Sequence, residues 1–97
     1  MSDDIATRIG PDPALLLVDD DEVFVARLAR AMERRGFRTR VATSVAGALA
    51  AVQADPPAYA VIDLRLEDGS GLDVVVEGRG GHLGHLLVVV IDRAGAV

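Results

Sequence analysis

The sequence predicts an α/β fold built on an open parallel sheet. Short apolar runs alternate along the chain with segments whose apolar residues recur at helical spacing, and this order gives parallel strands joined by helices. The 97 residues are 51% hydrophobic but only 3% aromatic, so the core must consist mainly of Val, Leu, Ile and Ala. That composition is typical of strands buried on both faces, and the length allows one domain.

The chain is expected to begin with a tail over residues 1–13, which is polar and acidic and lacks the layout of a signal peptide. Residues 14–18 then form an unbroken apolar run that is too short for a helix and predicts a buried strand. Three consecutive aspartates, Asp19, Asp20 and Asp21, end this run.

The first helix is predicted to follow these aspartates. Its apolar face carries, at helical spacing, Phe24, Leu28, Ala31 and Met32. Asp20 or Asp21 can cap the start of this helix, and Gly36 can end it.

A second strand and a second helix are predicted next. Residues 37–42 alternate weakly, as a strand does, and Ser44 can cap the helix that follows. The buried stripe of that helix is expected to consist of Val45, Leu49 and Val52. Two consecutive prolines at positions 56 and 57 end it.

The third strand is predicted over residues 59–62, and it runs directly into Asp63. A loop is expected over 67–71 from its composition, and residues 72–76 can start a helix. The glycines at 78, 80, 81 and 84 then oppose a crossover helix, since each costs a helix about 1 kcal/mol relative to Ala. A fourth strand is expected over 86–91, followed by Asp92.

Carboxylates follow two strands that the predicted sheet can bring together. Asp19, Asp20 and Asp21 end the first strand and Asp63 ends the third, so they meet at the carboxyl edge if these strands are neighbours. Like charges this close are costly unless a cation neutralises them. Oxygen ligands without cysteine select a hard cation, Mg²⁺ or Mn²⁺. The alternative is that these aspartates only cap helices and solvate loops.

Two motifs resemble a known family. The run Leu-Leu-Leu-Val followed by Asp19, Asp20 and Asp21 resembles the first strand and acidic loop of response-regulator receiver domains. The segment from Val61 to Asp73 resembles their phosphoacceptor strand and loop. The resemblance is closest to the redox-responsive global regulators of photosynthetic and respiratory genes in proteobacteria.

The resemblance implies a receiver-like domain over 14–97, of which 14–76 resembles the family and 77–97 diverges. It implies a flavodoxin-like receiver topology that is incomplete at the C-terminal end, with about four strands and two to three helices. Asp63 would be the phosphorylated aspartate. Asp20 would ligate Mg²⁺ (or Mn²⁺) directly. Asp63 and the backbone carbonyl of Arg65 would be further ligands, and Asp19 would support the ion through a water molecule. Asp21 is the alternative ligand if the loop is shifted by one residue.

The family pattern also requires a Ser or Thr after the fourth strand and a Lys after the fifth. Here Asp92 stands at the first of these positions, where its carboxylate would repel a phosphoryl group. The sequence contains no Lys, because all ten basic residues are Arg.

The leading functional hypothesis is a signalling receiver, not an enzyme, that accepts a phosphoryl group from a sensor histidine kinase onto Asp63. The alternative is a truncated receiver that binds a kinase or regulator as a decoy without being phosphorylated. A metal-dependent phosphatase is disfavoured, because Leu64 and Arg65 follow Asp63 where such enzymes often carry a second Asp.

Partners and location follow from charge and composition. A net charge of −5 argues against nucleic-acid binding by this chain, and no apolar run is long enough for a membrane span, so the protein is expected to be cytoplasmic. An incomplete sheet would expose an apolar edge or face and favour a homodimer. The glycines at 78–84 suggest a connector rather than a nucleotide loop, and His82 and His85 are expected to be solvated rather than metal ligands.

Overall fold

The computed structural model describes residues 13–78 and 87–92. The elements in chain order are β1 (Ala14–Val18), α2 (Glu22–Arg34), β2 (Arg38–Ala42), α3 (Val45–Ala54), β3 (Tyr59–Asp63), β4 (Arg65–Leu66), β5 (Gly69–Ser70), α4 (Gly71–Gly78) and β6 (Leu87–Ile91). Within the described ranges, the main sheet has the strand order β2-β1-β3-β6 and every pairing in it is parallel. The predicted open parallel sheet is therefore confirmed.

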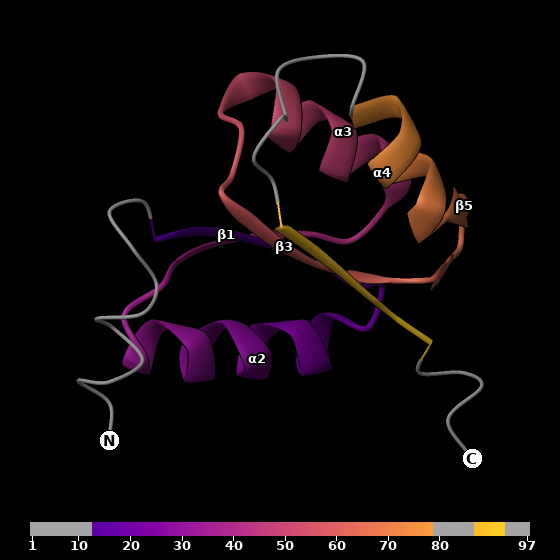
Figure 1. Ribbon diagram of the computed structural model, residues 1–97. Coiled ribbons are helices and arrows are strands. Elements are labelled where there is room, and N and C mark those ends of the chain that lie inside the picture. The colour runs from indigo at the N-terminus through magenta and orange to yellow at the C-terminus, as the bar shows by residue number, and fades with distance from the viewer. Residues whose placement is uncertain (1–12, 79–86, 93–97) are drawn as a thin grey trace.

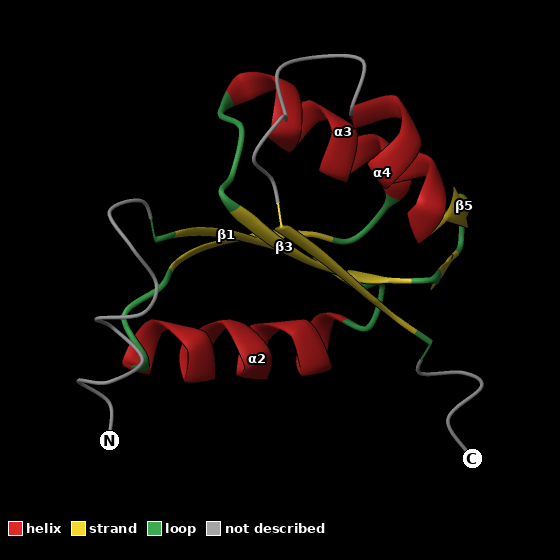
Figure 2. Ribbon diagram, viewed as in Figure 1, coloured by secondary structure: helices red, strands yellow, loops and turns green. Residues whose placement is uncertain are grey.

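The sheet forms the middle of three layers (Figure 1). Helix α2 covers one face, and helices α3 and α4 cover the other, as the colouring by secondary structure makes plain (Figure 2). Such a sandwich follows from the crossovers, because right-handed connections place helices on both faces of a parallel sheet. Among the described residues, no helix is both long and apolar enough to cross a bilayer.

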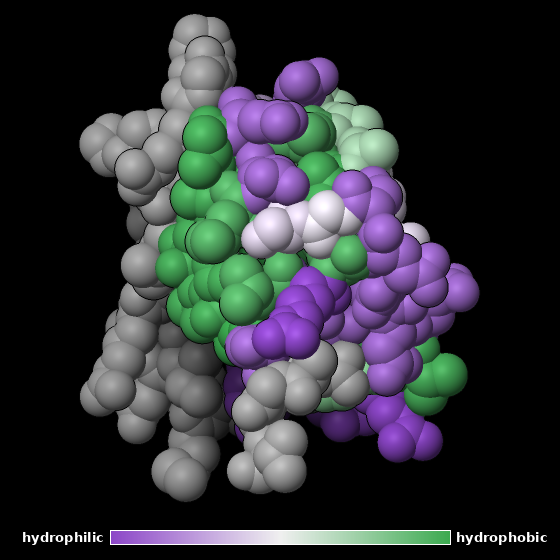
Figure 3. Space-filling view, turned by 90° about the vertical axis from the view of Figure 1, so that its right-hand side faces the viewer, coloured by the Kyte–Doolittle hydropathy of each residue, from purple (hydrophilic) through white to green (hydrophobic). Residues whose placement is uncertain are grey.

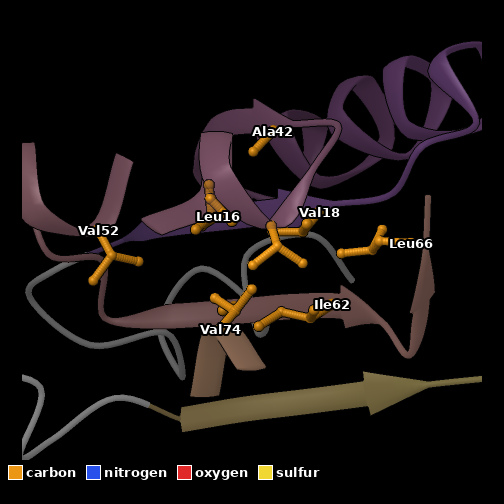
Figure 4. Close-up of a cluster of buried hydrophobic side chains, with 10 residues drawn as sticks. Leu16, Val18, Ala42, Val52, Ile62, Leu66 and Val74 are labelled. Carbon is orange, nitrogen blue, oxygen red and sulfur yellow. The ribbon is translucent and has the colours of Figure 1, made fainter. Parts of the chain in front are cut away.

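The core divides into two clusters because side chains alternate along β1. Leu15 and Leu17 pack with Val25 and Ala29 under α2. Leu16 and Val18 point to the other face, where they meet side chains of β3, α3 and α4 (Figure 4). All five residues of β1 are at most 3% exposed, which explains why this strand is an unbroken apolar run.

The predicted helix boundaries are confirmed, but the buried faces need correction. Asp21 caps α2 by accepting a hydrogen bond from the backbone N–H of Phe24 at 3.0 Å, and Gly36 after the helix has φ +101°. The buried residues of α2 are Val25 and Ala29, whereas Phe24 is only half-buried. Leu28 and Met32 of the predicted face are partly buried against the same cluster, so the prediction is right in part, and the centre of the buried face lies about one residue further along the helix.

Helix α3 shows the same effect. Ser44 caps it as predicted, accepting from the backbone N–H of Gly47 at 2.9 Å. Val45 and Val52 are buried as expected, but Ala48 is fully buried between them and Leu49 is only partly buried. An alanine at the point of closest approach lets the helix lie near the sheet.

The region after β3 is more ordered than a loop. Residues 65–70 form a short antiparallel hairpin of β4 and β5, which the composition did not indicate. The expected helix starts at Gly71, and the expected fourth strand is β6, paired with β3. The glycines at 80, 81 and 84, and His82 and His85, lie outside the described residues.

Candidate functional site

Three carboxylates meet at the carboxyl edge of the sheet. Asp19 follows β1, Asp20 comes next, and Asp63 is the last residue of β3. One carboxylate oxygen from each lies within 4.8 Å of the other two. Asp19 is 3% exposed and Asp63 is 6% exposed, while Asp20 is intermediate. We call these three residues the carboxylate cluster.

The sheet register produces the cluster. Val18 of β1 stands opposite Ile62 of β3, so the residues that follow them reach the same edge. The backbone N–H of Asp19 donates to the carbonyl of Ala42 at 3.1 Å, which continues the pairing with β2 past the end of β1. From the sequence, the meeting of these carboxylates depended on β1 and β3 being neighbours. The structure pairs these two strands directly.

Backbone donors orient two of the carboxylates. The N–H of Asp21 donates to Oδ1 of Asp19 at 2.9 Å. The N–H of Arg65 donates to Oδ1 of Asp63 at 3.3 Å. These bonds hold the two side chains in place.

The cluster suits a divalent cation. Three like charges whose oxygens lie within 4.8 Å of one another repel strongly, and two of the carboxylates are nearly removed from solvent. A cation with a preference for oxygen removes that cost, and carboxylates are the ligands that Mg²⁺ and Mn²⁺ take in proteins. The residues present therefore fit a hard divalent ion.

The structure separates the roles of Asp20 and Asp21, which the sequence left open. Asp21 is exposed, and its Oδ1 accepts from the N–H of Phe24 as the cap of α2. Among the described residues, the grouped carboxylates are those of Asp19, Asp20 and Asp63. Arg65 lies in β4, two residues past Asp63, so its backbone is next to the cluster.

Sequence reasoning missed the contact that Asp68 makes, whereas the family resemblance already implied that Gly69 and Gly71 shape the loop beside the site. Asp68, in the turn between β4 and β5, accepts from the N–H groups of Val45 at 2.8 Å and Ala46 at 3.2 Å at the start of α3. These hydrogen bonds lower the pKa of the Asp68 carboxyl. A β-carbon added to Gly71 would lie 2.3 Å from the backbone oxygen of Asp63, so this position has no space for a side chain. The contact of Asp68 with α3 and the contact of Gly71 with Asp63 have no local sequence signal, because in each case the partner lies in another element.

Asp92 and Arg65 form an ion pair at the same edge. Arg65 Nε lies 3.5 Å from Asp92 Oδ1, with the side chains 67% and 35% exposed. Asp92 directly follows Ile91, the residue paired with Asp63. The sequence placed Asp92 after the fourth strand, but it did not indicate a partner for its carboxylate.

Comparison with known proteins agrees with this geometry. Residues 15–91 match the response regulator receiver domain family. The chain is 63% identical over 75 residues to the photosynthetic apparatus regulatory protein RegA of Cereibacter sphaeroides, covering 77% of this chain and 41% of that protein. It is 60% identical over 75 residues to the acid tolerance regulatory protein ActR of Rhizobium meliloti, covering 77% and 39%. The chain thus spans about two fifths of the length of these relatives.

Solved structures share the fold. A response regulator from Burkholderia pseudomallei, solved with a phosphorylated aspartic acid, a calcium ion and citrate, superposes with a TM-score of 0.71 at 34% identity, over 81% of this chain and 47% of that one. A response regulator receiver protein from Pseudomonas putida gives 0.76 at 25% identity, over 86% and 69%. From the matched residues, the relatives and the shared fold, the chain belongs to the response regulator receiver domain family.

Proposed function

We propose that Asp63 accepts a phosphoryl group from a sensor histidine kinase, with Mg²⁺ held by Asp19, Asp20, Asp63 and the backbone carbonyl of Arg65. The observation that carries this proposal is the carboxylate cluster at the end of β1 and β3. In this role the domain, taken as residues 14–97 after a tail of 13 residues, works in the cytoplasm as a signalling module. It is phosphorylated once per signal rather than turning over a substrate.

The chemistry is a displacement at phosphorus. An oxygen of the Asp63 carboxylate attacks the phosphorus of a phosphohistidine, a P–O bond forms and the P–N bond breaks. The electron pair of the broken P–N bond stays on the imidazole nitrogen, which takes up a proton. A divalent ion would shield the charge between the carboxylates and the incoming phosphoryl group.

This chain's own residues would prepare the nucleophile. Burial and the N–H of Arg65 hold Asp63 in one position. Gly71 leaves the backbone beside it uncrowded. The structure from Burkholderia pseudomallei contains a phosphorylated aspartic acid and a calcium ion, which supports an acceptor aspartate in a domain of this fold that also binds a divalent ion.

The test is intact-mass spectrometry after incubation with a small acyl phosphate and Mg²⁺. We expect the wild type to gain one phosphoryl group and Asp63→Asn to gain none. Asp55→Asn is the matched control, because Asp55 is an exposed carboxylate that follows α3, outside the cluster. A wild type that stays unmodified, while circular dichroism shows it folded, would instead favour the decoy role.

A further inference from the structure

Arg65 and Asp92 form an ion pair beside the carboxylate cluster, and we propose that this pair sets how readily Asp63 accepts a phosphoryl group. Arg65 acts as the countercharge for the incoming group, and Asp92 competes with that group for the guanidinium. The inference rests on the proposed function, because it assigns a regulating pair to the same site. We call the two residues the rim pair.

The register of the sheet puts the rim pair next to Asp63. Asp63 stands opposite Ile91 in the pairing of β3 with β6, so Asp92 continues its strand one step beyond the acceptor. The N–H of Leu64 donates to the carbonyl of Ile91 at 2.7 Å, which fixes the start of the following loop against β6. The backbone around Asp92 and the backbone after Asp63 therefore lie together.

Arg65 contacts both acidic residues. Its backbone N–H donates to Asp63 Oδ1 at 3.3 Å, and its side-chain Nε lies 3.5 Å from Asp92 Oδ1. The guanidinium is two-thirds exposed, so it can turn between partners at little cost in packing. The positive charge of Arg65 can therefore move from Asp92 to a phosphoryl group that arrives at Asp63.

Other described arginines near the sheet are engaged elsewhere. Arg40 donates to the carbonyls of Ala51 and Asp55 at the C-terminal end of α3. Arg38 pairs with the carboxylate of Asp55 at 3.8 Å. Arg38 and Arg40 stand opposite Ala14 and Leu16 of β1, so they lie at least two residues before the strand end that carries the cluster.

The charges determine the direction of each effect. A phosphoryl group carries a charge of about −1.5 to −2, and on Asp63 this replaces the single negative charge of the carboxylate, so the edge becomes more negative. Asp92 repels that charge and holds Arg65 away from it, whereas Arg65 attracts it. The same two residues have opposite effects on a cation, because Asp92 adds to the field that attracts Mg²⁺ and Arg65 subtracts from it. The rim pair therefore shifts phosphoryl uptake and metal binding in opposite directions.

The experiment compares Asp92→Asn, Arg65→Gln and Arg65→Lys with the wild type. Initial rates of phosphorylation by a small acyl phosphate are measured by intact mass at saturating Mg²⁺, and Mg²⁺ affinity is measured by titration calorimetry without phosphodonor. We expect Asp92→Asn to raise the rate and weaken Mg²⁺ binding, each by roughly two- to five-fold, the range for an exposed charge pair. Arg65→Gln should do the reverse, and Arg65→Lys, which keeps the charge, should lie between Arg65→Gln and the wild type in both quantities.

The matched control is the ion pair of Arg38 and Asp55. Arg38→Gln and Asp55→Asn change the same kinds of charge away from the cluster, so they should leave both quantities unchanged. All rim-pair effects should shrink as salt rises, since exposed charges are screened.

The outcomes separate this inference from the proposed function. A phosphorylated wild type whose rate does not respond to Asp92→Asn overturns the inference and leaves the proposed function intact. If neither the wild type nor Asp92→Asn is phosphorylated, the proposed function fails, and the role of the rim pair in phosphorylation fails with it. Shifts of rate and Mg²⁺ affinity in the same direction also overturn the inference, because they indicate a change of structure rather than of charge.

Discussion

Asp68 connects the β4–β5 hairpin to the start of α3. The Asp68 carboxylate accepts hydrogen bonds from two backbone N–H groups of that helix, and these bonds lower the pKa of the Asp68 carboxyl. A lowered folded-state pKa contributes stability above the unfolded pKa of about 4, and that contribution is lost as pH falls through the folded pKa. We therefore expect Asp68→Asn to be less stable than the wild type at pH 7, with the difference constant down to about pH 4.5 and shrinking below it.

Urea unfolding followed by circular dichroism at several pH values measures this difference. The control is Glu67→Gln, which removes the neighbouring exposed carboxylate but no described hydrogen bond to α3. Curves for Asp68→Asn and the wild type that stay equally separated at all pH values would contradict the assigned role of the Asp68 charge.

Gly71 is expected to accept no side chain. A β-carbon there would lie 2.3 Å from the Asp63 backbone oxygen and 2.7 Å from Cγ2 of Ile62, and the first contact is with backbone that cannot rotate away. Crowding of this kind costs about 1–3 kcal/mol, so Gly71→Ala should lower the free energy of unfolding by at least about that much. Gly47→Ala is the control, because its β-carbon would approach a side-chain atom, the Ser44 hydroxyl at 3.1 Å, rather than backbone, and it should change stability by less than about 1 kcal/mol.

At the scale of elements, two adjacent aspartates at the start of α2 have different roles. Asp21 caps the helix, whereas Asp20 belongs to the carboxylate cluster. Removing an N-cap side chain costs about 0.5–2 kcal/mol. We expect Asp21→Ala to lose stability in this range and to change Mg²⁺ affinity by less than about two-fold. Asp20→Asn should weaken Mg²⁺ binding at least ten-fold and should not destabilise the metal-free protein, since it removes like-charge repulsion.

Unfolding in urea with a chelator, together with Mg²⁺ titration calorimetry, separates these two effects. A larger loss of Mg²⁺ affinity in Asp21→Ala than in Asp20→Asn would mean that the loop supplies its ligand one residue later than we assign. The comparison also tests the choice between Asp20 and Asp21 that the sequence alone left open.

The sequence predicted those elements whose signals are local. The apolar run of β1, the caps Asp21 and Ser44, and the left-handed turn at Gly36 all follow from a few adjacent residues. The cluster was predictable because it needs only the order of parallel strands. The buried faces of α2 and α3 were less predictable, because alanines at the closest approach are buried by geometry rather than by hydrophobicity.

Long-range contacts were beyond sequence reasoning. The carboxylate of Asp68 meets α3 across 23 residues of sequence, and Arg65 meets Asp92 only because β3 pairs with β6. A charged residue in a loop has no periodicity that identifies its partner. The β4–β5 hairpin was missed for the same reason, since two-residue strands are too short to show alternation.

At the scale of the whole molecule, the described sheet has β2 and β6 as its outer strands. These two edges differ in composition. Strand β2 carries Arg38, Thr39 and Arg40, whereas β6 reads Leu-Val-Val-Val-Ile without a charge. Val89 of β6 is 48% exposed. Seen from the carboxyl edge of the sheet, hydrophobic residues gather on one side of the molecule and hydrophilic residues cover the other (Figure 3).

An uncharged edge strand with exposed valine favours pairing with a second copy, because its backbone groups and apolar side chains gain a partner together. We therefore expect the chain to self-associate as concentration rises, and Val89→Lys to shift it toward monomer, since a charge on an edge strand opposes pairing. Val41→Lys is the control, because Val41 is similarly exposed, at 44%, on the edge strand that already carries arginines. Sedimentation velocity over a range of concentrations measures the effect. A wild type that remains monomeric throughout, or equal shifts from both variants, would show that β6 is not the contact surface.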